Sequence, residues 1–526
     1  MTPLLVLAVF LTAVTPDRRA TTAPVLPFES PTNAAPQGKI DDLVFAKLKH
    51  LGIQPAPLCS DAVFVRRVFL DVIGTLPTAK EARDFIAEEN PKKRKILIDR
   101  LLERKEFDDY WAMKWSDLLR VKSEYPINLW PNAVQSYHRW IRTCINDNLP
   151  YDRFVREMLT ASGSNFNVPQ VNFYRAIQSR EPPAIAQAVA LTFMGVRPES
   201  WSSQQWADMG TFFSQLQYKP TEQWKEEIVI FDPGKTSAQS TSDAPLEAVF
   251  PDGASAKLVP GQDPREVFAN WLVAPKNPWF ARNIVNRIWS WLLGRGIIHE
   301  PDDIRPNNPP VNPELLAYLE RELVSAHYDL NHIYRLILNS KTYQLSSIPE
   351  SDDPKGDANF SHYLPRRLEA EVLIDAICEV TRTTEKYSSP IPEPFTFIPE
   401  SQRSIELADG SINSSFLELF GRPSRDTGLE SERNNRPAAA QELHLLNSTH
   451  IRRKIEQSAK LREVLQSKKK PREIIEELYL TILSRYPTDD ELAAIRDYAQ
   501  PGHEGRRPMM DLIWALLNSA EFLYRH

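Results

Sequence analysis

The sequence predicts a mainly α-helical protein, with two helical halves joined by a small β insert. Three observations support this fold class: apolar residues recur at helical spacing along most of the chain, proline stands at helix starts, and glycine is scarce. The 526 residues include 43 prolines and 17 glycines. These are about 8% and 3% of the chain, against average usages of roughly 5% and 7%. Scarce glycine disfavours folds that need many tight turns, such as dinucleotide-binding folds and β-propellers.

The start of the chain predicts export. An uncharged apolar run extends from residue 4 to 14, which is too short to span a bilayer but suits the core of a signal peptide. We therefore expect a signal peptide over residues 1–20, followed by a linker rich in Thr, Ala and Pro over residues 21–38. The predicted location is periplasmic or secreted, with no stable membrane insertion.

Helix-start signals define the two helical domains. In the N-terminal domain, residues 39–222, Thr78 and Glu81 have the spacing of a capping box. In the C-terminal domain, residues 263–526, Thr488 and Glu491 repeat that spacing, and Asn312 precedes a proline at the first helical position. Much of the proline excess is therefore explained by sharply started helices rather than by disorder.

A different pattern separates the two domains. Residues 223–262 contain the short β-like segments EEIVIF, LEAVF and SAKLV, separated by Pro, Gly, Ser and Asp. We interpret this stretch as the small β insert.

Composition and motif searches exclude several functions. A formal net charge of −6 gives no nucleic-acid footprint, and Cys59, Cys144 and Cys378 are too few for a disulfide scaffold. The sequence leaves open whether two of these cysteines pair.

The string FDPGKTS resembles a phosphate-binding loop, but Val229 stands where that motif needs glycine. GRGIIH, from Gly294, is better explained as a helix end. We identify no catalytic residues, no metal site and no cofactor.

Several long strings together resemble a known pair of domains. Three strings are similar to the planctomycete secreted cytochrome-C-type domain, and five others are similar to the planctomycete secreted domain that usually follows it. The first three are FVRRVFLDVIGTLPTAKEARDFI, RLLERKEFDDYWAMKWSDLLR and NLPYDRFVREMLT; the others are NPWFARNIVNRIWSWLLGRGI, RLILNSKTYQLSS, RRLEAEVLIDAI, LHLLNS and WALLNSAEFLYRH. The resemblance covers about residues 40–526. It implies a helical, exported protein of unknown activity, whose partner is a second secreted protein encoded by neighbouring genes.

This chain departs from that family at two cysteine strings. Many members carry C-x-x-C-H after a GVR motif, a string that can attach haem covalently. Here MGVRPESWSSQQWADMGTFF, from Met194, has neither cysteine nor histidine. A second string, C-E-C-E-R, corresponds to the region of Gly428 and Ser431. We therefore predict no haem, and the missing C-x-x-C-H argues against electron transfer.

The same two regions supply the candidate ligand-binding residues. The string FGRPSRDTGLESERNNRP concentrates charged side chains that could hold a ligand or form an internal salt-bridge network. Two tryptophans near the missing haem string could stack on sugar rings or pack in the core. The candidates are Arg422, Arg425, Asp426, Glu430, Glu432, Arg433, Trp201 and Trp206.

Two functions remain open. The first is a non-haem binding or assembly protein that works with a secreted partner, which the lack of local catalytic motifs favours. The second is a polysaccharide-active hydrolase or lyase that uses the charged segment between Arg422 and Arg433. Neither predicts a nucleic-acid partner.

Overall fold

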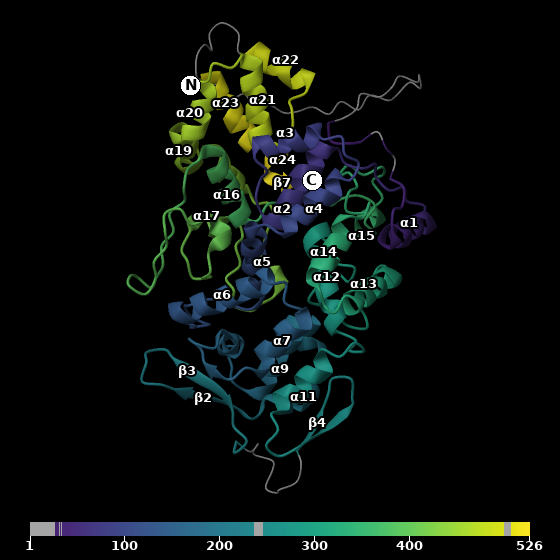
Figure 1. The fold of residues 1–526 in the computed structure, drawn as a ribbon, viewed down its shortest axis with the longest axis vertical. Helices are drawn as coiled ribbons and strands as arrows, with labels where there is room; N and C mark the ends of the chain where they lie inside the picture. Colours follow the sequence, from purple (N-terminus) through teal and green to yellow (C-terminus); the bar gives the residue numbers. More distant parts are fainter. Residues whose placement is uncertain (1–26, 31, 33, 236–245, 499–506) are drawn as a thin grey trace.

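The computed structural model describes residues 27–30, 32, 34–235, 246–498 and 507–526. It is mainly helical with small sheets, which confirms the predicted fold class (Figure 1). The predicted signal peptide, residues 1–20, lies outside the described residues, as do residues 21–26, 31 and 33 of the predicted linker. Within the described ranges, no helix combines the length and apolar character needed to cross a membrane.

Helices of the N-terminal half begin where the sequence supplies a capping group. The Thr78 hydroxyl accepts from the Glu81 N–H, and the Glu81 carboxylate accepts from the Thr78 N–H at 2.8 Å, so the predicted capping box is confirmed. Ser202 forms a second capping box with Gln205, and the Ser60 side chain caps α2 by accepting from the Val63 N–H. The helices of this half are α1 (Lys39–Leu51), α2 (Asp61–Ile73), α3 (Ala79–Ala87), α4 (Lys93–Leu102), α5 (Lys105–Leu118), α6 (Pro131–Asn146), α7 (Tyr151–Thr160), α8 (Asn172–Arg175), α9 (Pro182–Met194) and α10 (Ser203–Gly210), with the 3-10 turns η1 (Pro169–Val171), η2 (Pro198–Ser200) and η3 (Thr211–Phe213).

Between the two helical halves the chain forms short antiparallel strands. β3 (Glu227–Phe231), β4 (Leu246–Val249) and β5 (Ser255–Leu258) coincide with the three predicted segments. β3 pairs with β1 (Gly163–Ser164) and β2 (Leu216–Pro220), in a register that places Tyr218 opposite Val229, and β4 pairs with β5. The prediction missed β1, which has only two residues, and β2, whose sequence LQYKP ends in proline and lacks the β-branched residues of β3. Residues 236–245 of the predicted insert lie outside the described residues.

The C-terminal half repeats the same start and stop devices. The Asn312 side chain accepts from the Leu315 N–H, with Pro313 at the first helical position. Gly294 ends α12 at a φ of +83°, where an added Cβ would lie 2.6 Å from the Arg366 side chain. The helices are α11 (Pro264–Leu272), α12 (Phe280–Leu293), α13 (Pro313–Ser325), α14 (Leu330–Leu338), α15 (Lys355–Ala358), α16 (Ala370–Thr381), α17 (Ser415–Leu419), α18 (Ala439–Asn447), α19 (Thr449–Gln457), α20 (Ala459–Leu465), α21 (Pro471–Ile482), α22 (Asp489–Tyr498), α23 (Arg507–Leu517) and α24 (Ala520–Leu523), with η4 (Ser404–Glu406) and η5 (Glu430–Glu432).

The two halves share one continuous hydrophobic core. α9 packs on α12, α7 on α11, and α3 on α21, so neighbours in space come from distant parts of the sequence (Figure 1). The last strand, β7 (Tyr524–Arg525), pairs with β6 (Arg366–Arg367) and lies against α2. Most long elements therefore depend on partners from the other half of the chain.

All three cysteines are free thiols. Cys59 and Cys144 are buried, and Cys378 is partly buried on α16. Burial raises the pKa of the Cys144 thiol to about 12, with smaller contributions from Glu157 and Asp147. This thiol is therefore a packing group rather than a nucleophile.

Candidate functional site

The predicted charged segment forms an irregular loop between α17 and α18, here called the charged loop (residues 420–436). Gly421 and Gly428 both have positive φ angles. A Cβ at Gly421 would lie 1.8 Å from the Asn434 carbonyl oxygen, because the two ends of the loop pass that closely. The Asn434 N–H donates to the Gly421 carbonyl at 3.0 Å and closes the loop on itself.

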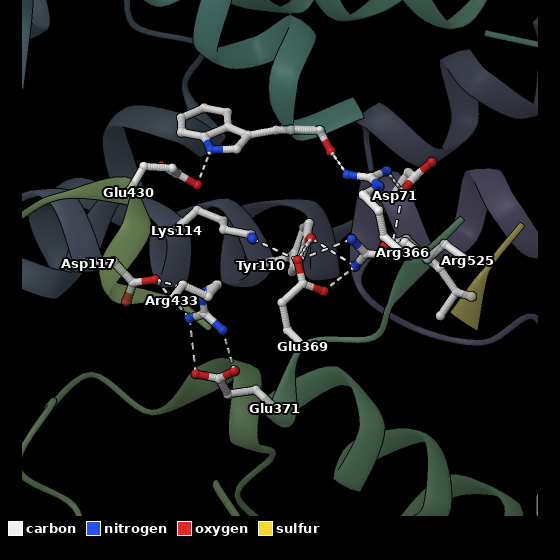
Figure 2. A network of polar contacts seen from close by, with 12 residues as sticks. Asp71, Tyr110, Lys114, Asp117, Arg366, Glu369, Glu371, Glu430, Arg433 and Arg525 are labelled. Atoms are coloured by element: carbon white, nitrogen blue, oxygen red, sulfur yellow. Dashed lines mark hydrogen bonds and ion pairs between the residues drawn. The ribbon is translucent and has the colours of Figure 1, made fainter. Parts of the chain in front are cut away.

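Arg433 fastens this loop to two helices. Its guanidinium donates to Asp117 of α5 at 2.7 and 3.1 Å and to Glu371 of α16 at 2.6 and 3.1 Å (Figure 2). The side chains of Arg433 and Glu371 are 5% and 2% exposed. Burial lowers the pKa of Arg433, but Asp117 and Glu371 outweigh it and hold that pKa above its usual range. Arg433 is therefore a fully engaged structural cation.

Two further arginines of the charged loop are also paired inside the protein. Arg425 donates to Asp117 at 2.9 Å and to the Ala408 carbonyl at 2.8 Å. Arg422 donates to the Ile412 carbonyl. Burial lowers the pKa of Arg422, with Glu371 opposing it.

The acidic residues of the loop have partners as well. Lys122 donates to Asp426 at 2.6 Å, and one oxygen of Glu432 accepts from Ser424 and from two backbone N–H groups of the loop. Glu430 accepts from the indole N–H of Trp291 at 2.8 Å (Figure 2). The six predicted loop residues therefore come together, and their charges have partners within the packed protein, although the second oxygen of Glu432 is buried without one.

The same network contains further buried charged residues that are not among the candidates predicted from the sequence. Glu369 accepts from Lys114 of α5 at 2.7 Å and from Arg525 of the C-terminal strand, and Arg366 donates to Asp71 of α2 at 3.1 Å (Figure 2). These residues lie inside the strings that carry the family resemblance. That location is the signal that could have pointed to them.

The two tryptophans form a separate site. Their ring centroids are 4.6 Å apart, and Trp201 also contacts Trp279 at 5.9 Å. Trp206 is 3% exposed and donates its indole N–H to the Pro198 carbonyl at 2.8 Å. Trp206 therefore packs in the core, and among the described residues no hydrogen bond or ring contact joins the pair to the charged loop.

A cavity of about 500 Å³, here called the α3–α16 cleft, is lined by neither the charged loop nor the tryptophan pair. Its walls come from the α2–α3 turn and α3, the start of α5, the end of α16 with residues 382–385, residues 401–403, and α20. The volume is within the range of small-molecule sites, about 300–1,000 Å³. None of the eight predicted site residues lines it.

Most charges that line the cleft are paired. Arg104 donates to Glu106 at 2.5 and 3.2 Å and to Glu81 at 2.9 Å. Asp375 accepts from the backbone N–H groups of Ser404 at 2.7 Å and Ile405 at 3.1 Å. Burial raises the pKa of Asp375, although Arg403 and these hydrogen bonds oppose it.

Glu379 and Lys460 differ from the other charged residues of the cleft because they have few or no partners among the described residues. Among the described residues, the Glu379 carboxyl has no hydrogen-bond or ion-pair partner, and the Lys460 ammonium donates only to the Glu379 backbone carbonyl, at 3.5 Å. Burial raises the pKa of Glu379, with Arg403 and Lys460 opposing it. Burial lowers the pKa of Lys460, with Glu379 opposing it. No motif or spacing in the sequence distinguishes Glu379 among the 69 acidic residues.

Neither a metal site nor a covalent haem site has its ligands among the described residues. Within the described ranges, no group of three or more His, Cys, Asp or Glu side chains could hold a metal ion. At the position of the missing haem string, η2 and α10 carry neither Cys nor His, and the packed Trp201–Trp206 pair occupies the space beside them. These residues do not fit a covalently attached haem.

Two family models match the chain in tandem. Residues 39–209 match PSCyt2, a protein of unknown function (DUF1549), and residues 264–499 match PSD1, a protein of unknown function (DUF1553). The chain belongs to the family that joins these two planctomycete domains. No curated protein and no solved structure matches it.

Residues of both matched ranges line the α3–α16 cleft. Its wall at residues 75–106 lies in the PSCyt2 match, and its wall at residues 375–460 lies in the PSD1 match. The four strands β2–β5 lie outside both matched ranges. The α3–α16 cleft is thus built jointly by both members of the domain pair.

We expect Arg433→Met to reduce the free energy of unfolding by about 3–5 kcal/mol, because it leaves Asp117 and Glu371 buried without that partner. Urea unfolding followed by circular dichroism measures the loss. Arg436→Met is the matched control, since Arg436 is exposed three residues further on. Equal unfolding midpoints for the two variants would contradict a structural role for Arg433.

We also expect Glu369 to contribute an acid-sensitive part of the stability. Burial raises the pKa of Glu369, but Arg525 and Lys114 outweigh it and hold that pKa well below its usual value. The unfolded chain therefore takes up a proton at higher pH than the native state, so this contribution is complete above about pH 4.3 and is lost as the pH falls through the native pKa.

Unfolding free energies measured between pH 7 and pH 3 check this expectation. The wild type should lose stability below about pH 4 more steeply than Glu369→Gln. The exposed Glu350 supplies the control variant Glu350→Gln, which should keep the wild-type slope. Parallel pH profiles for the wild type and Glu369→Gln would refute the assignment.

Proposed function

We propose that the protein is an exported, non-haem ligand-binding protein and that the α3–α16 cleft is its binding site. The observation that carries this proposal is the composition of the cleft. A cavity of about 500 Å³ has walls from both matched domains, and among the described residues the Glu379 carboxyl in its lining has no hydrogen-bond or ion-pair partner. A cavity between two domains is a common location for ligand sites.

The distribution of charge supports this assignment over the charged loop. A ligand must replace the hydration of the groups that it contacts, and groups already paired within the protein have little left to offer. Arg433 donates its hydrogen bonds to Asp117 and Glu371. Arg425 donates to Asp117 and to backbone carbonyls. Glu379 and Lys460 in the cleft keep their hydrogen-bonding capacity.

Export and a partner belong to the same proposal. The apolar run at residues 4–14 supports export. The resemblance to secreted planctomycete proteins supports a role beside a second secreted protein encoded nearby. Binding in the cleft and assembly with that protein are compatible, because the cleft uses only part of the surface.

Occluding the cleft tests this proposal. Ser401 is exposed at the cleft wall, and Ser401→Trp places an indole in the cavity. A thermal-shift screen would use neutral sugars, sugar acids, amino acids, organic acids and phosphate. A ligand present at 100 times its Kd stabilises the native state by about 2.7 kcal/mol, which raises the Tm measurably. We expect Ser401→Trp to abolish that rise.

Ser351→Trp is the matched control, because Ser351 is also exposed but does not line the cleft. It should retain the full response of the wild type. A response that persists in Ser401→Trp would place the ligand outside the cleft and overturn the proposal, as would a screen in which no compound raises the Tm.

A further inference from the structure

Glu379 and Lys460 are two desolvated groups of opposite kind in one cavity. The carboxyl of Glu379 accepts hydrogen bonds and the ammonium of Lys460 donates them. Both side chains are partly buried, and this burial raises the pKa of Glu379 and lowers the pKa of Lys460. An unmatched buried polar group costs free energy that a bound ligand can recover. A fitting ligand must therefore present both donors and acceptors.

The remaining lining narrows the chemistry of that ligand. Acidic and basic side chains nearly balance: Glu81, Glu106, Asp375, Glu379 and Glu385 face Arg104, Arg382, Arg403 and Lys460. Such a balance gives no net field that favours a strongly charged ligand. Outside this charge set, the lining contains Thr and Ser hydroxyls and the Gln402 amide, together with the apolar Leu76 and the weakly polar thiol of Cys378.

Aromatic side chains do not line the cleft within the described residues. A flat apolar ligand would therefore find no stacking surface, although most small-molecule sites are predominantly apolar. A ligand covered with hydroxyl groups fits better, since each hydroxyl donates one hydrogen bond and accepts two. One such ligand could accept from Lys460 and donate to Glu379 without adding charge to the cavity.

Fixed groups around these two residues prepare the site. Arg403 donates to the Thr75 hydroxyl at 2.5 Å, and its Nε lies 3.6 Å from Asp375. Asp375 in turn holds the turn at Ser404 and Ile405. The part of the wall at Arg403 is therefore held in place before a ligand binds, which lowers the entropy cost of binding.

We propose that the α3–α16 cleft binds an uncharged saccharide, with Glu379 and Lys460 forming its central hydrogen bonds. This inference rests on the proposed function, because it names the ligand class of the same cleft. A free sugar and the end of a polysaccharide chain offer the same hydroxyl chemistry, so the experiment includes both.

The test is isothermal titration calorimetry on the full chain. The first arm uses glucose, galactose, mannose, xylose and their disaccharides, and the second uses a neutral oligosaccharide of six units. The third arm uses glucuronic acid and glucose 6-sulfate. We expect binding in the first or second arm, and the arm that binds more tightly distinguishes a free sugar from a chain end.

Glu379→Gln and Lys460→Met should each weaken that binding at least tenfold, because each removes a hydrogen bond to a charged group. Glu350→Gln and Lys468→Met make the same changes at exposed residues outside the cleft and should bind as the wild type does. Melting curves for all four variants verify that they are folded. Arg403→Lys offers a milder change should Glu379→Gln fail to fold.

The outcomes separate the two proposals. Binding confined to the third arm, and abolished by Ser401→Trp, overturns the saccharide class as stated here and leaves the cleft as the binding site. Wild-type affinity in both Glu379→Gln and Lys460→Met overturns the assignment of these residues. Sugar binding that survives Ser401→Trp overturns both proposals, because the ligand then lies elsewhere.

Discussion

Arg433 and Glu369 anchor a network of buried charges on which the arrangement of the helices depends. Arg433 joins the charged loop to α5 and α16, and Glu369 joins α5 to the C-terminal strand through Lys114 and Arg525. Burying such groups is unfavourable unless each has its partners. A packing that separated these partners would leave buried charges unmatched, so the network disfavours it.

That restriction also limits where function can reside. A guanidinium held by two carboxylates, as in Arg433, is rigid and has few hydrogen bonds left for a ligand. Polar groups without partners are therefore more informative than charge density. Among the described residues the Glu379 carboxyl has no partner and the Lys460 ammonium has only one backbone carbonyl at 3.5 Å. Arg433 of the charged loop, in contrast, is fully engaged, and the buried unpaired atoms of that loop are one oxygen of Glu432 and the amide oxygen of Asn435.

Local structure could be predicted from the sequence, but the polar network could not. Thr78 and Glu81 are three residues apart, so one capping motif contains the whole interaction. Arg433 and Asp117 are 316 residues apart, and Arg525 and Glu369 are 156 apart. Periodicity identifies a buried helix face but does not identify the partner of a charge on it. The charged loop could therefore be located, while its structural role required the fold.

The cleft follows from the same physics of pairing. α16 contributes Asp375 and Glu379, one turn apart on the face toward α3. Asp375 accepts hydrogen bonds from the turn at Ser404 and Ile405, which directly follows the lining residues 401–403. Glu379 cannot reach an equivalent partner and remains open to the cavity. One helix thus supplies both the group that shapes the cleft and the group left for a ligand, which explains why the two family domains must be packed together for the site to exist.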